Sequence, residues 1–341
     1  MDDLLVEVMT NPAPPATAPV VDLVDSVTAV LGHVALSEHK RDELDRWAHP
    51  ASADGTSDGA PGAVGLVARA TDADGALLGY AHLSGDGGSQ FAVELVVPEA
   101  AVDVRADPAP VDVADVLLDA VEEVVTERGG GLLRLWAALA DETDDARAKA
   151  HRFVLERELL QMRCALPLAP LEAPLFAGTS TELRSFRPGL DEEAWLTTNN
   201  RAFASHPEQG HWTLDTLVER EREPWFDPDG FVVLESGGRL AGSCWTKVHG
   251  TVDPPMGEIY VISVDPDFHG RGWGRALTRA GLDWLAARGL TVGMLYVDAA
   301  NGAAVSLYRS MGFTVDHVDR AYVKQVASVE HVASVEHVAS H

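Results

Sequence analysis

The chain has 341 residues, 46% of them hydrophobic and 23% charged, a composition that is ordinary for a folded protein and excludes wholesale disorder. The length favours two domains, each large enough to bury its own core. The formal net charge of −27 argues against nucleic-acid binding, because contact with phosphate backbones requires a basic face.

The ends and the cysteines of the chain carry few functional signals. The first residues, Met1, Asp2 and Asp3, are not a basic segment leading into an apolar core, and no run approaches the 18 apolar residues of a membrane span. We therefore expect a cytoplasmic protein. Cys164 and Cys244 are too few for a disulfide framework or a metal cluster, so we expect reduced core thiols and no metal.

The first half begins with residues 1–18, whose Pro, Ala and Thr content predicts a flexible N-terminus. Apolar spacing then predicts a helix over residues 20–47, and a Gly, Ser, Asp and Pro cluster predicts a loop over residues 51–63. The remaining patterns predict strands at 65–69, 77–83 and 91–97, a helix at 112–127 and a strand at 132–138. We assign residues 19–165 to an N-terminal domain.

Three prolines mark residues 166–180 as a linker to a C-terminal domain, residues 181–325, which is followed by a low-complexity tail, residues 326–341. The predicted elements of this domain are a helix at 192–203, a hairpin of 231–235 and 239–247, a strand at 258–264, a helix at 274–287, a strand at 292–297, a helix at 303–311 and a strand at 321–324. The order repeats that of the first half. Glu94 and Glu258 fall at matching places, which indicates a duplication.

The segment from Val264 to Arg275 carries the clearest chemical signal. An apolar strand leads into a Gly-rich turn that opens an amphipathic helix. The free N–H groups and the dipole at a helix N-terminus bind anions, glycines allow a pyrophosphate to approach the backbone, and Arg271 and Arg275 add positive charge. Taken alone, the pattern also suits a tight turn without a ligand.

This turn resembles the acetyl-CoA loop of the Gcn5-related N-acetyltransferase (GNAT) superfamily, with His269 where the superfamily has Gln or Arg, followed by Gly272 and Gly274. Asn301 and residues 303–313 match its closing helix and turn. The resemblance implies an α/β (α+β) fold of two tandem GNAT domains, each a mixed, mainly antiparallel twisted sheet flanked by helices. It also implies acetyl-CoA contacts by Ile262, Ser263, Val264, His269, Gly270, Arg271, Gly272, Trp273, Gly274, Arg275, Asn301, Ala303, Ala304 and Ser306.

Within that superfamily the chain is similar to the mycothiol synthase family. The similarity lies in residues 199–203, 206–210, 225–230, 245–249 and 257–261, and it covers nearly all of residues 181–324. The first half matches only loosely. The resemblance implies acetyl transfer from acetyl-CoA to the cysteinyl amine of cysteinyl-glucosaminyl-inositol, by direct attack.

Amide formation from a thioester needs a neutral amine, a polarised carbonyl and a proton for the leaving thiolate. The resemblance gives Glu258 the role of general base and Tyr308 that of general acid. Main-chain N–H groups around residues 262–264 would polarise the carbonyl, which requires an irregular strand. Without the resemblance, Glu258 would be taken as a solvent-facing strand end, and Tyr308 as a core aromatic residue, which is compatible with its acid role.

The resemblance further implies that Glu208, Lys247, Glu258 and Tyr296 bind the substrate and that Glu38 reaches it from the first domain. Polar side chains suit a hydroxyl-rich ligand, although Glu208 and Lys247 also fit a solvated surface and Tyr296 a core strand.

The first half departs from the superfamily after Glu94. No Gly-x-Gly follows its strand, and Glu99, Asp103 and Asp107 would repel a pyrophosphate. We expect a degenerate domain without useful acetyl-CoA affinity, in a monomeric protein. Two other functions fit the same fold: N-acetylation of an aminoglycoside, a polyamine or a peptide N-terminus, and non-catalytic acyl-CoA sensing.

Overall fold

The computed structural model describes residues 4–10, 14–31, 34–48, 64–70, 76–98, 112–170, 181–204, 210, 212–250 and 254–328. The chain forms two compact units. Unit 1 comprises Met1–Glu158 with Val318–His341, and unit 2 comprises Leu159–His317.

Unit 1 is built on a sheet with the strand order β1-β2-β3-β4-β5-β12. All neighbouring strands are antiparallel except β4 and β5, which are parallel. The strands are β1 (Leu4–Thr10), β2 (Val64–Ala70), β3 (Leu77–Gly85), β4 (Gln90–Val96), β5 (Gly131–Ala137) and β12 (Thr314–Val326).

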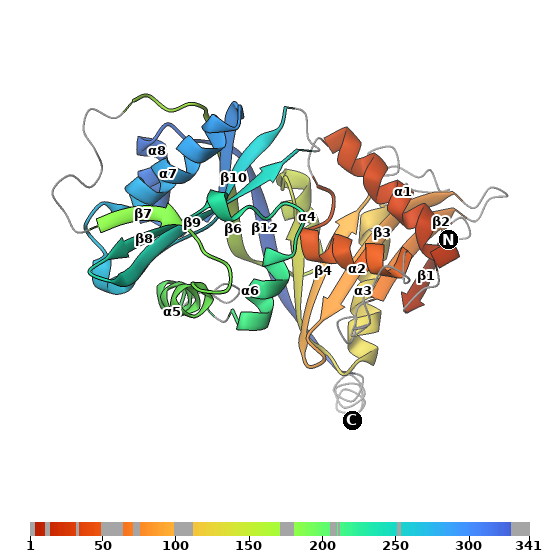
Figure 1. The fold of residues 1–341 in the computed structure, drawn as a ribbon. Helices are drawn as coiled ribbons and strands as arrows, with labels where there is room; N and C mark the ends of the chain where they lie inside the picture. The colour runs from red at the N-terminus through yellow and green to blue at the C-terminus, as the bar shows by residue number, and fades with distance from the viewer. Residues whose placement is uncertain are drawn as a thin grey trace. The chain divides into compact units, whose positions relative to one another are not determined.

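Helices pack on both faces of this sheet (Figure 1). The four helices of the described part of unit 1 are α1 (Pro14–Leu31), α2 (Glu38–Ala48), α3 (Val113–Glu127) and α4 (Glu142–Ala150). One core cluster buries the apolar side of α3, with Leu117, Val121 and Val125, and the other buries α1 and α2 through Val20 and Leu44. Because successive strand residues point to opposite faces, one sheet supplies both clusters.

Unit 2 repeats the same plan with the strand order β7-β8-β9-β10-β11-β6. Only β10 and β11 are parallel. The strands are β6 (Val154–Ala165), β7 (Thr181–Ser185), β8 (Phe231–Ser236), β9 (Arg239–His249), β10 (Met256–Val264) and β11 (Val292–Asp298).

In unit 2, α7 and α8 cover one face of the sheet and α5 and α6 the other (Figure 1). The bounds are α5 (Glu192–Ala202), α6 (Leu214–Glu221), α7 (Trp273–Ala287) and α8 (Gly302–Ser310), with short 3-10 helices η3 (Pro228–Gly230) and η4 (Pro266–Phe268). Leu277, Leu285 and Tyr308 belong to the first core cluster, and Trp195 and Trp245 to the second. The two units are therefore tandem copies of one α/β plan.

The units divide the chain differently from the domains expected at residues 19–165 and 181–325, because the last strand of each plan comes from the other half of the sequence. Leu159–Ala165 of β6 pair with β11 in unit 2. Arg320–Val326 of β12 pair with β5 in unit 1. The unit boundaries consequently fall inside β6 and β12 rather than in the Pro-rich segment, whose residues 171–180 lie outside the described part of the chain.

The expectation of a flexible N-terminus over residues 1–18 was wrong. Leu4–Thr10 form β1, paired with β2, and α1 begins at Pro14. The run Leu4–Met9 is rich in leucine and valine, which suits a strand, and proline is tolerated in the first turn of a helix. The Pro, Ala and Thr content of residues 1–18 therefore gave a wrong expectation. The helix expected over residues 20–47 is divided into α1 and α2, and the sequence reading did not identify α4, β6, β7 or α6. The final strand is longer than expected and reaches Val326, inside the supposed tail, whose residues 329–341 lie outside the described part.

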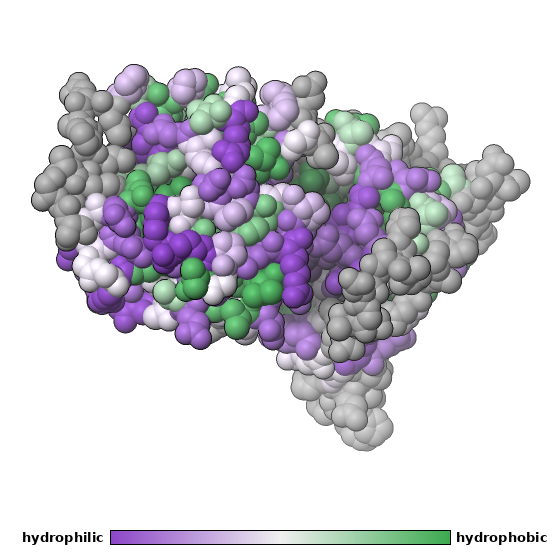
Figure 2. All heavy atoms as spheres, in the orientation of Figure 1, coloured by the Kyte–Doolittle hydropathy of each residue, from purple (hydrophilic) through white to green (hydrophobic). Residues whose placement is uncertain are grey.

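On the face drawn in Figure 2, hydrophilic side chains surround small apolar patches. No helix among the described residues combines the length and the apolar character that crossing a membrane requires.

Candidate active site

The turn before α7 is open to an anion. Gly270 and Gly272 both have φ of +76°, a left-handed conformation that favours glycine, and Gly272 caps α7 without a side-chain hydrogen bond. The first intrahelical bond runs from Ala276 N to Gly272 O at 3.2 Å. The N–H groups between them therefore point out of the helix end, where they can bind phosphate oxygens.

Two arginines next to this turn have no carboxylate partner among the described residues. The Arg271 guanidinium lies 5.1 Å from the Phe268 ring centroid and 5.2 Å from that of Trp273, and Arg275 donates to Ser310 Oγ. In contrast, Arg201 pairs with Asp265 at 2.9 Å. In a chain with net charge −27, two such cations at an uncapped helix start provide a site for an anion.

β10 is irregular where it leads into this turn. Its register with β9 shifts between Ile259 and Val261. The parallel ladder of β10 with β11 ends at the pair Ile259 and Leu295, although the strands continue to Val264 and Asp298. Main-chain groups after Ile259 therefore lie beyond that ladder, which is the irregularity that a main-chain binding role for residues 262–264 requires.

Glu258 lies just before the irregularity, on the face of the sheet opposite to α7. It is buried, and its Oε2 is 2.8 Å from Nε2 of His249 on β9. Lys247 is its direct partner in the β9–β10 register. The Lys247 ammonium lies 4.5 Å from the ring centroid of Trp225 and 5.5 Å from that of Tyr260, so it is held over aromatic faces.

The same face continues across β11 and β6. Tyr296 is in register with Gln161, and Gln161 Nε2 donates to the Tyr296 hydroxyl at 2.8 Å. Arg163 Nε donates to Gln161 Oε1 at 2.7 Å. Leu295 and Val297, the neighbours of Tyr296, belong to the core cluster under α7, so alternation places Tyr296 on the Glu258 side. Three sequence-predicted residues, Lys247, Glu258 and Tyr296, thus share one polar sheet face.

Tyr308 lies on α8 in the core cluster on the other face, with its ring centroid 5.7 Å from that of Phe313. Burial, with a smaller effect of Cys244, raises the pKa of the Tyr308 phenol above its ordinary value. The hydroxyl therefore stays protonated, which a proton donor requires. Asn301 begins α8 as its N-cap and accepts from Ala304 N at 3.1 Å.

The other sequence-predicted residues fall at several places. Ser263 is buried on β10 and its Oγ lies 3.2 Å from Ser243 Oγ, while His269 Nε2 is 3.0 Å from Val264 O. Glu38 is exposed at the start of α2 in unit 1, and Glu208 lies outside the described residues. The remaining predicted contacts lie on β10, in the turn or on α7 and α8: Ile262, Val264, Gly270, Trp273, Gly274, Ala303, Ala304 and Ser306.

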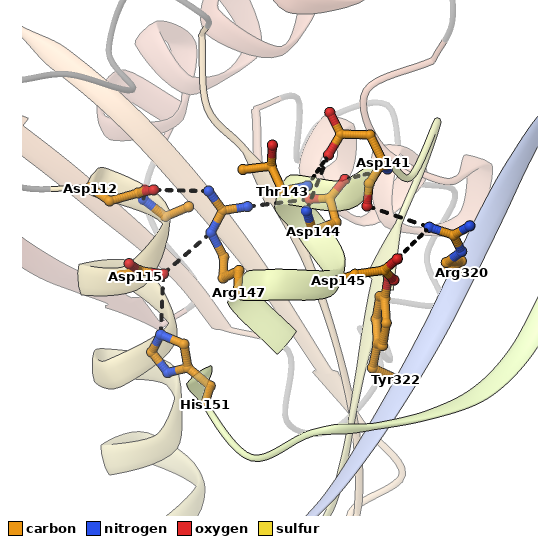
Figure 3. A network of polar contacts seen from close by, with 11 residues as sticks. Asp112, Asp115, Asp141, Thr143, Asp144, Asp145, Arg147, His151, Arg320 and Tyr322 are labelled. Atoms are coloured by element: carbon orange, nitrogen blue, oxygen red, sulfur yellow. Dashed lines mark hydrogen bonds and ion pairs between the residues drawn. The ribbon is translucent and has the colours of Figure 1, made fainter. Parts of the chain in front are cut away.

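Unit 1 closes the corresponding helix end with its own side chains. Asp112 caps α3, accepting from Ala114 N at 2.8 Å, and also accepts from Arg147 at 2.9 Å. Arg147 lies between Asp112, Asp115 and Asp144 (Figure 3). Its guanidinium nitrogens are 2.9, 3.3 and 3.2 Å from the carboxylate oxygens of these residues, in that order. The Asp112 carboxylate thus caps the helix end in unit 1, whereas the equivalent end at Gly272 in unit 2 is open. The charge of Arg147 is already neutralised by its aspartate partners.

Sequence reasoning gave no separate role to His249, Gln161 or Trp225, which contact Glu258, Tyr296 and Lys247 respectively. His249 could have been found from the hairpin register, because it and Lys247 are two apart on one strand. Gln161 gave no such signal, since its strand belongs to the other half of the sequence.

The acetyltransferase (GNAT) family model matches residues 192–313. A GCN5-related N-acetyltransferase from Sphaerobacter thermophilus has a similar structure, with a TM-score of 0.68, 21% identity, and coverage of 96% of this chain and 97% of that one. A tandem GNAT protein from the clavulanic acid biosynthesis pathway has a TM-score of 0.65, 15% identity, and coverage of 95% and 99%. The fold is that of two tandem GNAT units, and the segment matched by the acetyltransferase family model lies in the second of them.

Relatives by sequence narrow the class. A mycothiol acetyltransferase from Geodermatophilus obscurus is 42% identical over 309 residues, which cover 90% of this chain and 93% of that protein. Another from Thermobispora bispora is 51% identical over 202 residues, covering 58% of this chain and 68% of that protein. The chain belongs to the mycothiol acetyltransferase family.

Proposed function

We propose that this protein transfers the acetyl group of acetyl-CoA to the cysteinyl amine of cysteinyl-glucosaminyl-inositol, giving mycothiol. The observation that carries the proposal is the 42% identity to a mycothiol acetyltransferase along nearly the whole of both chains. The polar sheet face with Glu258, Lys247 and Tyr296 supports it, because a hydroxyl-rich amine needs several polar contacts.

Acetyl-CoA fits the turn before α7. The open helix end provides donors for the diphosphate, and Arg271 and Arg275, which have no carboxylate partner among the described residues, provide charge. The main chain of residues 262–264, beyond the end of the β10–β11 ladder, is suited to the pantetheine arm and to the carbonyl oxygen. Asn301, Ala303, Ala304 and Ser306 at the start of α8 complete the proposed contacts.

A residue or main-chain group can then be assigned to each step of acetyl transfer. Glu258 removes a proton from the substrate ammonium, and the neutral nitrogen attacks the thioester carbonyl. Main-chain N–H groups of residues 262–264 stabilise the negative oxygen of the tetrahedral intermediate. Tyr308, kept protonated by burial, donates its proton to the sulfur as the C–S bond breaks. Acetyl transfer is direct, without an acyl-enzyme.

Substrate recognition rests on Lys247, Glu258 and Tyr296 in unit 2, with Glu208 and Glu38 as further contacts of the proposal. The protein would act as a cytoplasmic monomer on a small-molecule amine, without a metal. Size-exclusion chromatography with light scattering tests the monomer, and full activity after chelator treatment is the expected outcome for the absence of a metal.

The decisive experiment incubates the protein with acetyl-CoA and cysteinyl-glucosaminyl-inositol and follows the acetylated product by mass spectrometry. Thiol reagents do not serve here, because the amine substrate carries its own thiol. An aminoglycoside, a polyamine and a peptide N-terminus are the competing substrates, and preference for any of them by kcat/KM would replace the proposal.

The variant Glu258→Gln separates an enzyme from a sensor. It is expected to keep acetyl-CoA binding and to lose about 100-fold or more in kcat. Unchanged turnover with intact binding would remove Glu258 as the base and favour acyl-CoA sensing.

A further inference from the structure

His249 is the hydrogen-bond partner of the Glu258 carboxylate, and no step described above uses it. Its Nε2 lies 2.8 Å from Glu258 Oε2. The β9–β10 register explains the contact: Lys247 is directly opposite Glu258, and His249 is two residues further along the same strand, on the same face. Side chains at such diagonal positions reach each other when they are long.

We propose that His249 is a positioning residue for Glu258. The imidazole N–H at Nε2 donates to Oε2, fixes the plane of the carboxylate and leaves Oε1 for the proton of the amine. The proposal rests on the acetyl transfer proposed above, and it assigns a role to a residue that has none there.

Because Glu258 is buried, the orientation of its carboxylate depends on this hydrogen bond. The Glu258 side chain is 10% exposed and that of His249 27%, so the carboxylate has little water to orient it and the imidazole is the more solvated partner. Lys247, the other basic group on this part of β9, has its ammonium over the Trp225 and Tyr260 rings. A rotated carboxylate would place its oxygen about 1 Å from the attack geometry, a displacement that can lower a rate about 100-fold.

Three variants test the proposal by steady-state acetyl transfer to cysteinyl-glucosaminyl-inositol. His249→Ala is expected to lower kcat about 10- to 100-fold with an unchanged KM for acetyl-CoA. His249→Gln, whose amide can replace the Nε2 donor, is expected to recover most of that loss. In the Glu258→Gln background, His249→Ala is expected to have no further effect.

His151→Gln, in unit 1, is the matched control and is expected to have wild-type kinetics. Calorimetric titration with CoA verifies that each variant folds and binds. The positioning role is overturned if His249→Ala keeps the kcat of the wild type, or if it lowers kcat equally in the Glu258→Gln background. In either case, acetyl transfer by the wild-type protein still supports the proposed function. If the wild type itself does not acetylate this amine, the proposed function fails instead, and the two failures are distinct.

Discussion

Glu94 and Glu258 occupy equivalent positions in the two units, but their carboxylates have different partners. Each lies on the first strand of the parallel pair, β4 or β10, opposite a basic residue of the preceding strand, His82 and Lys247 respectively. Glu94 accepts from the Ser37 N–H and hydroxyl, each at 2.7 Å, and its Oε1 is 3.5 Å from the Lys40 ammonium. In unit 1, residues of α2 and of the segment before it therefore bind the Glu94 carboxylate, whereas in unit 2 the Glu258 carboxylate contacts His249.

Acetyl-CoA should bind once per chain. In unit 1 Asp112 caps α3 and Arg147 is neutralised, whereas the α7 end is open. Isothermal titration calorimetry is expected to give a stoichiometry of one. Two tight sites per chain would contradict the assignment of unit 1 as a degenerate domain.

Arg271→Ala and Arg275→Ala should each weaken acetyl-CoA binding. Loss of one charge at the helix start costs about 1 kcal/mol, roughly a fivefold increase in KM for acetyl-CoA, with kcat unchanged and with a smaller effect at high salt. Arg279→Ala is the control, because Arg279 lies on the same helix but pairs with Asp283 at 2.7 Å. An equal effect of all three variants would exclude a specific role for the turn.

Tyr308→Phe should lower kcat about 100-fold and leave the thermal midpoint nearly unchanged, because phenylalanine keeps the contact with Phe313 but has no proton to donate. Tyr322→Phe, which removes a hydroxyl bound to Asp145 in unit 1, is the control and should keep full kcat. Retained turnover in Tyr308→Phe would require another acid.

Lys40→Met should destabilise the protein by about 3 kcal/mol, because it leaves a buried carboxylate without its cation. Burial acts to raise the pKa of Glu94, but Lys40 and the Ser37 bonds outweigh it and hold that pKa below its ordinary value. Urea unfolding measures the loss, which should be smaller in the double variant Lys40→Met/Glu94→Leu. Lys149→Met, at an exposed site, should be neutral.

Glu221 should make stability depend on pH. Burial, together with Glu192, raises the pKa of Glu221 from 4.5 to about 7. The folded state therefore holds a proton that the unfolded state releases, and the unfolding free energy should fall as pH rises from about 4.5 to about 7.

Glu221→Gln should remove this part of the slope and be more stable than the wild type above pH 7 by roughly 1 kcal/mol, since solvent screens a partly exposed carboxyl. Denaturant midpoints of the variant and the wild type, measured across this pH range, test the prediction. The control is Glu219→Gln, at an exposed site on the same helix. An unchanged slope would show that Glu221 is charged in the folded state throughout.

The sequence by itself determined the features that lie within one continuous segment. The strand, glycine turn and helix from β10 to α7 follow from the apolar pattern and from glycines that tolerate positive φ, so the open helix end and the position of Glu258 could be predicted. The order of α5, β8, β9, β10, α7, β11, α8 and β12 was predicted for the same reason, whereas β7 and α6 were not identified.

Only the tertiary structure decided the relationships between distant segments. The contact of Gln161 with Tyr296 joins residues 135 positions apart, and the contact of Ser37 with Glu94 joins residues 57 positions apart. The exchange of β6 and β12 brings together strands from opposite halves of the chain. A local pattern fixes which face of a strand a side chain takes, but not which strand lies beside it, because pairing depends on how the whole sheet buries its two faces.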